Sequence, residues 1–172
     1  MAVFMIANEI DRIKEGAGSS DELFGMVKVK YVVDCNGNAE EVLARAKEIL
    51  LDVLQATVRG WPELQQWSNV LPDWFFKAFS KEMTDEEALL WLERWRVMPR
   101  EQQVIAEEKK GWSFSNWIGW FNPNERHWYW WDASIDNAST ISITVLSADS
   151  QSPYGTLKWL LIACGAKSLD ES

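Results

Sequence analysis

Residues 126–148, RHWYWWDASIDNASTISITVLSA, indicate the fold class more clearly than any other segment. The first nine of them are rich in aromatic side chains, which favour β-strands. Residues 140–148 alternate isoleucine and valine with serine and threonine, the pattern of a strand with one buried face. Turn-forming residues, DNAS, occupy 136–139 between them. The segment therefore predicts two antiparallel strands joined by a short turn.

Two further segments have the same period. Residues 112–121, WSFSNWIGWF, carry aromatic and apolar residues at steps of two, and the turn-forming NPNE follows at 122–125. We therefore expect 112–121 to be the first strand of a three-stranded C-terminal meander. Residues 26–33, MVKVKYVV, also alternate and are a candidate for an additional strand at an edge of the sheet.

Helical spacing covers much of the remaining chain. The apolar residues between 39 and 58 recur at the intervals of an amphipathic helix, with Asn38 and Glu41 resembling a capping box at its start. Thr84 and Glu87 form a stronger capping pair ahead of ALLWLERWRVM at 88–98. Pro99 ends that helix and starts another.

The two ends of the chain contribute less sharply defined elements. Residues 1–15 predict a helix, followed by a connector over GAGSSD at 16–21. A largely buried helix is predicted from Ser152–Pro153 to a stop at Gly165, and we expect the tail KSLDES, 167–172, to be frayed.

Together these elements predict an α+β fold with a mainly antiparallel sheet covered by helices. A length of 172 residues favours a single domain over 1–172. Within it we distinguish a strand–helix unit at 1–60, a helical segment at 61–111, and the meander with its closing helix at 112–166.

Tryptophan is the most unusual feature of the composition. The chain has twelve, and six of them fall between residues 112 and 131. By alternation, His127, Tyr129 and Trp131 would point to one side of the strand, and Trp128, Trp130 and Asp132 to the other. A sheet with a solvated face alternates with polar residues, and this segment does not. The favoured interpretation is that helices cover both faces, and the alternative is that one face is exposed and binds a ligand or partner.

That alternative defines the candidate site. The ligand- or partner-binding candidates lie in and beside the aromatic segment: Trp117, Arg126, His127, Trp128, Tyr129, Trp130, Trp131 and Asp132. An arginine near aromatic residues, such as Arg94, Arg96 or Arg126, could stack on an indole, although ordinary surface ion pairing is the favoured interpretation.

Charge and composition disfavour several classes of partner and cofactor. The net charge of −9 opposes binding to nucleic acid and to anionic membranes, and favours a basic protein partner. One histidine and two distant cysteines, Cys35 and Cys164, do not form a metal site, so we expect neither a metal nor another cofactor. The N-terminus is a poor signal peptide, which favours the cytoplasm. The oligomeric state is not predicted.

The leading functional hypothesis is a non-catalytic protein-binding module, comparable to an inhibitor or immunity protein, with an acidic, aromatic-rich surface. A small-molecule binding protein with a tryptophan-lined cleft is the alternative. A hydrolase using His127 with Glu125 or Asp132 is a third and weaker hypothesis, because the spacing does not require a catalytic arrangement.

Overall fold

The computed structural model describes residues 2–18, 23–148 and 153–172 of the chain. Within these ranges the elements follow the order α1 (Ala2–Glu15), β1 (Val27–Asp34), α2 (Ala39–Arg59), a 3-10 helix η1 (Leu64–Asn69), α3 (Asp73–Phe76), α4 (Asp85–Arg96), α5 (Arg100–Lys110), α6 (Phe114–Gly119), β2 (Trp128–Asn137), β3 (Thr140–Ser147), α7 (Tyr154–Ala163) and β4 (Ser168–Glu171). Part of the predicted connector, 19–21, and Ser152, the predicted start of the last helix, lie outside the described residues.

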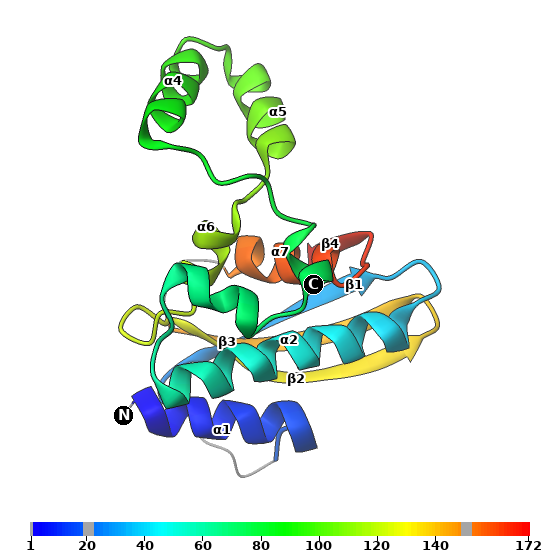
Figure 1. Cartoon of the computed structure of the whole chain (residues 1–172). Helices are drawn as coiled ribbons and strands as arrows, with labels where there is room; N and C mark the ends of the chain where they lie inside the picture. Colours follow the sequence, from blue (N-terminus) through cyan, green and yellow to red (C-terminus); the bar gives the residue numbers. More distant parts are fainter. Residues whose placement is uncertain (1, 19–22, 149–152) are drawn as a thin grey trace.

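The four strands form one open, fully antiparallel sheet in the order β2-β3-β1-β4 (Figure 1). The predicted α+β class with an antiparallel sheet and helices is confirmed. The predicted pair of strands over 126–148 corresponds to the hairpin of β2 and β3. β1 is an inner strand between β3 and β4, and not an edge strand.

The main core lies between the sheet and α2. Apolar residues of α2 at helical spacing are buried against the inner face of β1 and β3, where Tyr31, Val33, Ile141, Ile143 and Val145 are fully buried. α7 packs into the same core with Leu157, Leu160 and Leu161. The helix predicted over 39–58 is confirmed, but the Asn38 side chain makes no capping hydrogen bond. The capping box of Thr84 and Glu87 is present as predicted.

The strand predicted over 112–121 is wrong, because this segment contains the short helix α6. Phe114, Trp117, Ile118 and Phe121 follow helical spacing and are all buried in the core. The Ser113 hydroxyl accepts a hydrogen bond from the backbone N–H of Asn116 and caps the helix. The alternation at every second residue, which predicted a strand, includes only some of the apolar residues of this segment. The full set also fits the spacing of a helix.

The C-terminal tail is not frayed where β4 forms. β4 pairs with β1, and this pairing is extended by hydrogen bonds from Lys167 N to Asp34 O and from Ser172 N to Lys30 O. An unpaired edge of β1 would leave a row of backbone donors and acceptors without partners, and β4 satisfies several of them.

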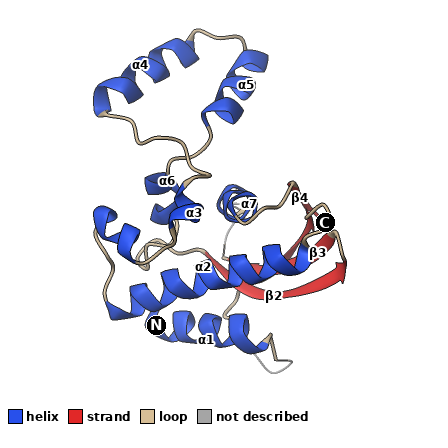
Figure 2. Cartoon of the chain, turned by 45° about the vertical axis from the view of Figure 1, so that its right-hand side comes forward, coloured by secondary structure: helices blue, strands red, loops and turns tan. Residues whose placement is uncertain are grey.

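Helices α4 and α5 stand apart from the rest of the described chain, which we call the body. Figures 1 and 2 show them as an antiparallel pair joined to the body by two chain segments. We call residues 85–110 the α4–α5 hairpin, and residues 80–84 with 111–113 the neck.

Candidate protein-interaction site

Three of the candidate tryptophans belong to the main core. Trp117, Trp128 and Trp130 are fully buried. The Trp117 indole N–H donates to the carbonyl of Thr156 at 2.9 Å, and its ring contacts Phe75 edge to face at 4.9 Å. Such rings stabilise the fold through their buried area, and they are not accessible to a partner.

The other two candidate rings lie on the opposite face of the sheet. Tyr129 and Trp131 are only 6% exposed and pack with Met26 and Leu146 in a second, smaller core. Phe24, from the segment between α1 and β1, also packs against it. Both faces of the aromatic strand are therefore covered, but on this face the predicted cover by helices is joined by non-helical residues, since Met5 of α1 packs there together with Ala17 and Phe24.

The edge of β2 is held by a buried network of charges. The Arg126 guanidinium forms two hydrogen bonds to the Glu9 carboxylate, at 3.0 and 2.8 Å, with both side chains almost completely buried. Glu9 also accepts from the backbone N–H of Trp130, and Arg12 donates to the Trp130 carbonyl. Glu9 and Arg12 of α1 thus make hydrogen bonds to the outer edge of β2 that a neighbouring strand would otherwise make.

Surface ion pairing, the favoured interpretation for Arg126, is therefore wrong for this residue. Its guanidinium lies inside the molecule, 4.5 Å from the centre of the Tyr129 ring. Because Arg126 and Glu9 lie far apart in the sequence, no local pattern indicated their pairing.

His127 and Asp132 are not brought together. The His127 Nδ1 is 2.7 Å from the Glu125 carbonyl oxygen, and its ring lies against the edge of Trp120. A β-bulge at Trp131 places Asp132 opposite Thr144, on the same face as Tyr129 and not with Trp130 as alternation predicted. Among the described residues, no side-chain carboxylate or hydroxyl hydrogen-bonds the His127 ring.

The candidacy of these eight residues as a binding site stays a prediction. Five of them are buried, and Arg126, His127 and Asp132 are half-buried, so they give a partner little to contact. Five of the thirteen exposed large apolar residues of the described chain lie in the α4–α5 hairpin: Leu89, Leu90, Val97, Val104 and Ile105. Their exposed fractions range from 41% to 84%.

No residue of α4 or α5, both described in full, is buried. The rings of Trp91 and Trp95, both on α4, stack on each other, and α5 contacts them through Lys110, whose Nζ lies 4.3 Å from the centre of the Trp91 ring. Gln103 Nε2 also donates to the Trp95 carbonyl. The pair is thus held together along one side, while its other apolar residues face solvent.

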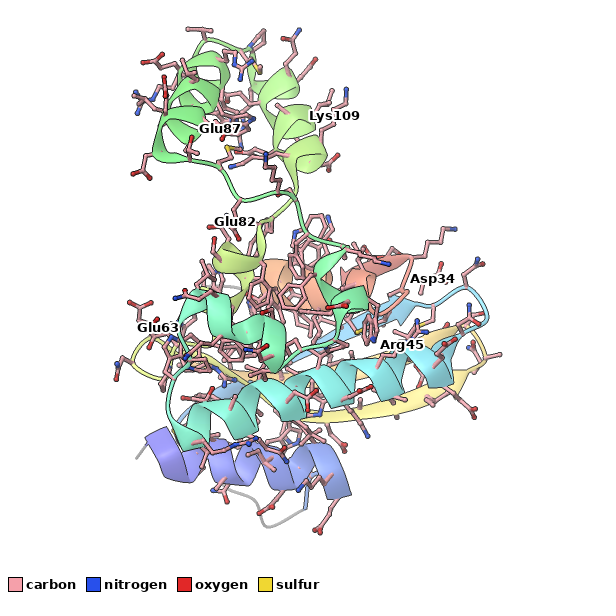
Figure 3. All side chains as sticks on the ribbon, in the orientation of Figure 1. Asp34, Arg45, Glu63, Glu82, Glu87 and Lys109 are labelled. Carbon is pink, nitrogen blue, oxygen red and sulfur yellow. The ribbon has the colours of Figure 1, made fainter. Side chains whose placement is uncertain are left out.

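The neck fixes the hairpin to the body. The Glu82 carboxylate accepts from the backbone N–H and the hydroxyl of Ser115, at 2.9 and 2.7 Å. Figure 3 shows Glu82 on the connection between the hairpin and the body. Ser80 N donates to the Trp112 carbonyl, and the Trp112 ring lies against Gly155 of α7. These contacts make the neck an ordered joint.

The exposed apolar residues of the hairpin were not among the sequence candidates. By helical spacing, Ala88, Trp91, Leu92 and Trp95 share one apolar face of α4. Leu89 and Leu90 lie off that face, and a helix that uses a single apolar face has polar residues there. This second set of apolar positions was the signal available in the sequence.

The body carries one open cleft that contains an exposed ring. It has a volume of about 480 Å³ and lies between the end of α2 and η1, lined by Asp52, Arg59, Trp61, Gln66 and Asn69 among others. Burial, and then the nearby Glu48 carboxylate, raise the pKa of Asp52. Trp61 is 36% exposed and packs edge to face on Trp67.

The cysteines offer little chemistry. Cys35 and Cys164 are free and buried. Burial raises the pKa of the Cys164 thiol to about 12, so the reactive thiolate is disfavoured. In the described ranges no group of three or more His, Cys, Asp and Glu side chains is arranged to hold a metal ion.

No helix within those ranges is long and apolar enough to cross a membrane. Comparison of the chain with family models, with curated proteins and with solved structures found no match.

Proposed function

We propose that this protein is a non-catalytic protein-binding module and that the α4–α5 hairpin is its binding element. The observation that carries the proposal is a helical hairpin whose two helices have no buried residue and which exposes five large apolar side chains, four on the helices and Val97 between them. Contiguous apolar surface on a soluble protein marks interaction sites, and amphipathic helices are common docking elements.

The charge of the body supports a basic protein as a further target. The hairpin, residues 85–110, holds five Lys and Arg against seven Asp and Glu, so the rest of the chain holds twelve against nineteen. An acidic body attracts cationic partners and accelerates their approach at low ionic strength. This is compatible with an inhibitor-like or immunity-like role.

The experiment compares tagged full-length protein with two double variants in affinity capture from native extract. Leu89→Ser/Ile105→Ser makes the hairpin polar. Val58→Ser/Leu64→Ser is the matched control, because these two body residues are similarly exposed, at 50% and 48%. Thermal unfolding verifies that each variant is folded.

We expect a protein recovered in stoichiometric amounts with the wild type and the control variant, and lost with the hairpin variant. An untagged copy of the chain is co-expressed and quantified, so that binding of a second copy is distinguished from binding of another protein. Equal recovery with all three proteins would contradict the proposal.

The cleft beside Trp61 supports a second candidate, the binding of a small molecule. An exposed indole offers a face for stacking, and Asp52, Arg59 and the amides of Gln66 and Asn69 offer hydrogen-bonding groups around it. A thermal-shift screen of sugars and aromatic metabolites tests this candidate. A stabilising compound should lose its effect with Trp61→Ala and keep it with Leu64→Ala, and a screen without any stabilising compound would remove the candidate.

The hydrolase hypothesis stays a prediction without structural support, because His127 has only a backbone carbonyl as its hydrogen-bond partner in the described chain.

A further inference from the structure

We propose that the α4–α5 hairpin binds a second copy of this chain, with the two α4 helices packed antiparallel about a twofold axis. The inference rests on the proposed function of the hairpin as a protein-binding element and names its partner.

One stripe of α4 carries the inference. Asp85, Leu89, Leu92 and Arg96 are spaced at i, i+4, i+7 and i+11, so at about 100° per residue they fall within an arc of about 60°. Asp85, Leu89 and Arg96 are exposed, and Leu92 is half-buried. We call these four residues the α4 stripe.

The α4 stripe is complementary to itself when reversed. Asp85 and Arg96 are the two end residues of α4, and Leu89 and Leu92 lie equally far from its midpoint, between Leu90 and Trp91. A twofold axis through that midpoint therefore places Asp85 against Arg96 of the second copy, twice, and each Leu89 against Leu92 of the other. A self-complementary patch of this kind is what a twofold interface requires.

The charges at both ends of the stripe have no partners of their own. Within the described ranges, neither Asp85 nor Arg96 forms an ion pair or a side-chain hydrogen bond. Antiparallel packing also brings the positive N-terminal end of each helix dipole towards the negative C-terminal end of the other, which is favourable.

The charge distribution suits contact through the hairpin and not through the body. The hairpin, residues 85–110, has a net charge of −2, so the remaining residues carry −7 of the total of −9. Two acidic bodies repel each other over distances of roughly 8 Å at physiological ionic strength. Because the hairpin projects from the body (Figures 1 and 2), two copies can join at their hairpins and keep their bodies apart.

Sedimentation equilibrium of the full-length chain, from micromolar to millimolar concentration, tests the inference. We expect a monomer–dimer equilibrium that Asp85→Arg and Arg96→Asp each weaken by at least about tenfold, which corresponds to about 1.4 kcal/mol, because each places like charges opposite each other twice. An equimolar mixture of the two single variants should form a heterodimer as stable as the wild-type dimer, since both charge pairs are then restored.

Arg94→Asp is the matched control. Arg94 is exposed and lies on the opposite side of α4 from Asp85, so this variant makes the same charge change as Arg96→Asp outside the stripe. It should dimerise like the wild type. Far-UV circular dichroism verifies that α4 stays helical in each variant.

A wild-type monomer at every concentration would overturn the inference. So would a dimer that neither stripe variant weakens, or single variants that do not restore each other on mixing. If the chain is monomeric but the Leu89→Ser/Ile105→Ser variant still loses a different captured protein, the inference fails and the proposed function stands. If that variant changes neither capture nor self-association, both fail.

Discussion

At the scale of single residues, Glu9 and Arg126 form a buried ion pair between α1 and the edge of the sheet. Both side chains are almost fully buried, and together they satisfy backbone groups at the edge of β2. Breaking such a pair by removing one partner leaves an uncompensated charge in the interior.

Arg126→Met should therefore lower the free energy of unfolding by about 3–5 kcal/mol. The double variant Glu9→Gln/Arg126→Met should be more stable than Arg126→Met alone, because the buried carboxylate is neutralised. Glu41→Gln breaks an exposed pair with Arg45 and should cost less than about 1 kcal/mol. Urea unfolding measures all three, and a double variant less stable than Arg126→Met would contradict this account.

Two buried tryptophans differ in one hydrogen bond. Trp117 Nε1 donates to the Thr156 carbonyl, whereas the buried Nε1 of Trp128 has no acceptor among the described residues. Replacement by phenylalanine removes similar volume at both positions, but at Trp117 it also removes a buried hydrogen bond, whereas at Trp128 it removes a buried N–H that has no acceptor among the described residues. Trp117→Phe should therefore destabilise the protein more than Trp128→Phe, by about 1 kcal/mol or more, in urea unfolding. The reverse order would show that the assigned hydrogen bond is wrong.

The carboxylate of Asp52 should make stability depend on pH. Burial and Glu48 raise the pKa of Asp52 in the folded chain above its unfolded value. The protonated form therefore favours folding, and this contribution is full below the unfolded pKa and is lost as the pH rises through the folded pKa. Asp52→Asn should thus become progressively more stable than the wild type between acidic and neutral pH. A stability difference that stays constant across this range in urea unfolding would contradict the prediction.

At the scale of elements, close packing between α7 and the neck provides a matched pair of glycines. A Cβ on Gly155 of α7 would lie 2.6 Å from Cζ2 of Trp112, whereas a Cβ on Gly119 of α6 meets nothing within 4 Å. Gly155→Ala should destabilise the protein by about 1–3 kcal/mol through overpacking, while Gly119→Ala should be neutral or stabilising, as alanine favours helices. Thermal unfolding of both variants checks this, and equal effects would contradict the packing of Trp112 on α7.

The elements that the sequence predicted well are those with a single clear period. The helix over 39–58, the strand over 140–148 and the capping box at Thr84 each follow from local spacing. The segment 112–121 was mistaken for a strand because its dense aromatic residues fit both periods. β4 was missed because a short polar tail forms a strand only when a distant edge, that of β1, pairs with it.

At the scale of the whole molecule, the burial of the aromatic segment could be predicted from the sequence, whereas the position of the exposed apolar surface could not. We could predict that both faces of β2 are covered, because exposing so many aromatic rings to water costs free energy. The projection of the α4–α5 hairpin could not be predicted, because it depends on which apolar faces remain unpaired after the body has packed. The Glu9–Arg126 pair could not be predicted either, because its two residues lie far apart in the sequence and meet only in the folded chain.

We expect the chain to associate with itself through the α4–α5 hairpin and not through the aromatic sheet. Hydrogen–deuterium exchange of the full-length chain, measured at a series of protein concentrations, tests it most directly. Exchange should slow with increasing protein concentration in peptides covering residues 85–110 and stay unchanged in peptides covering 126–134. Slowing confined to 126–134, or a hairpin whose exchange does not depend on concentration, would contradict it.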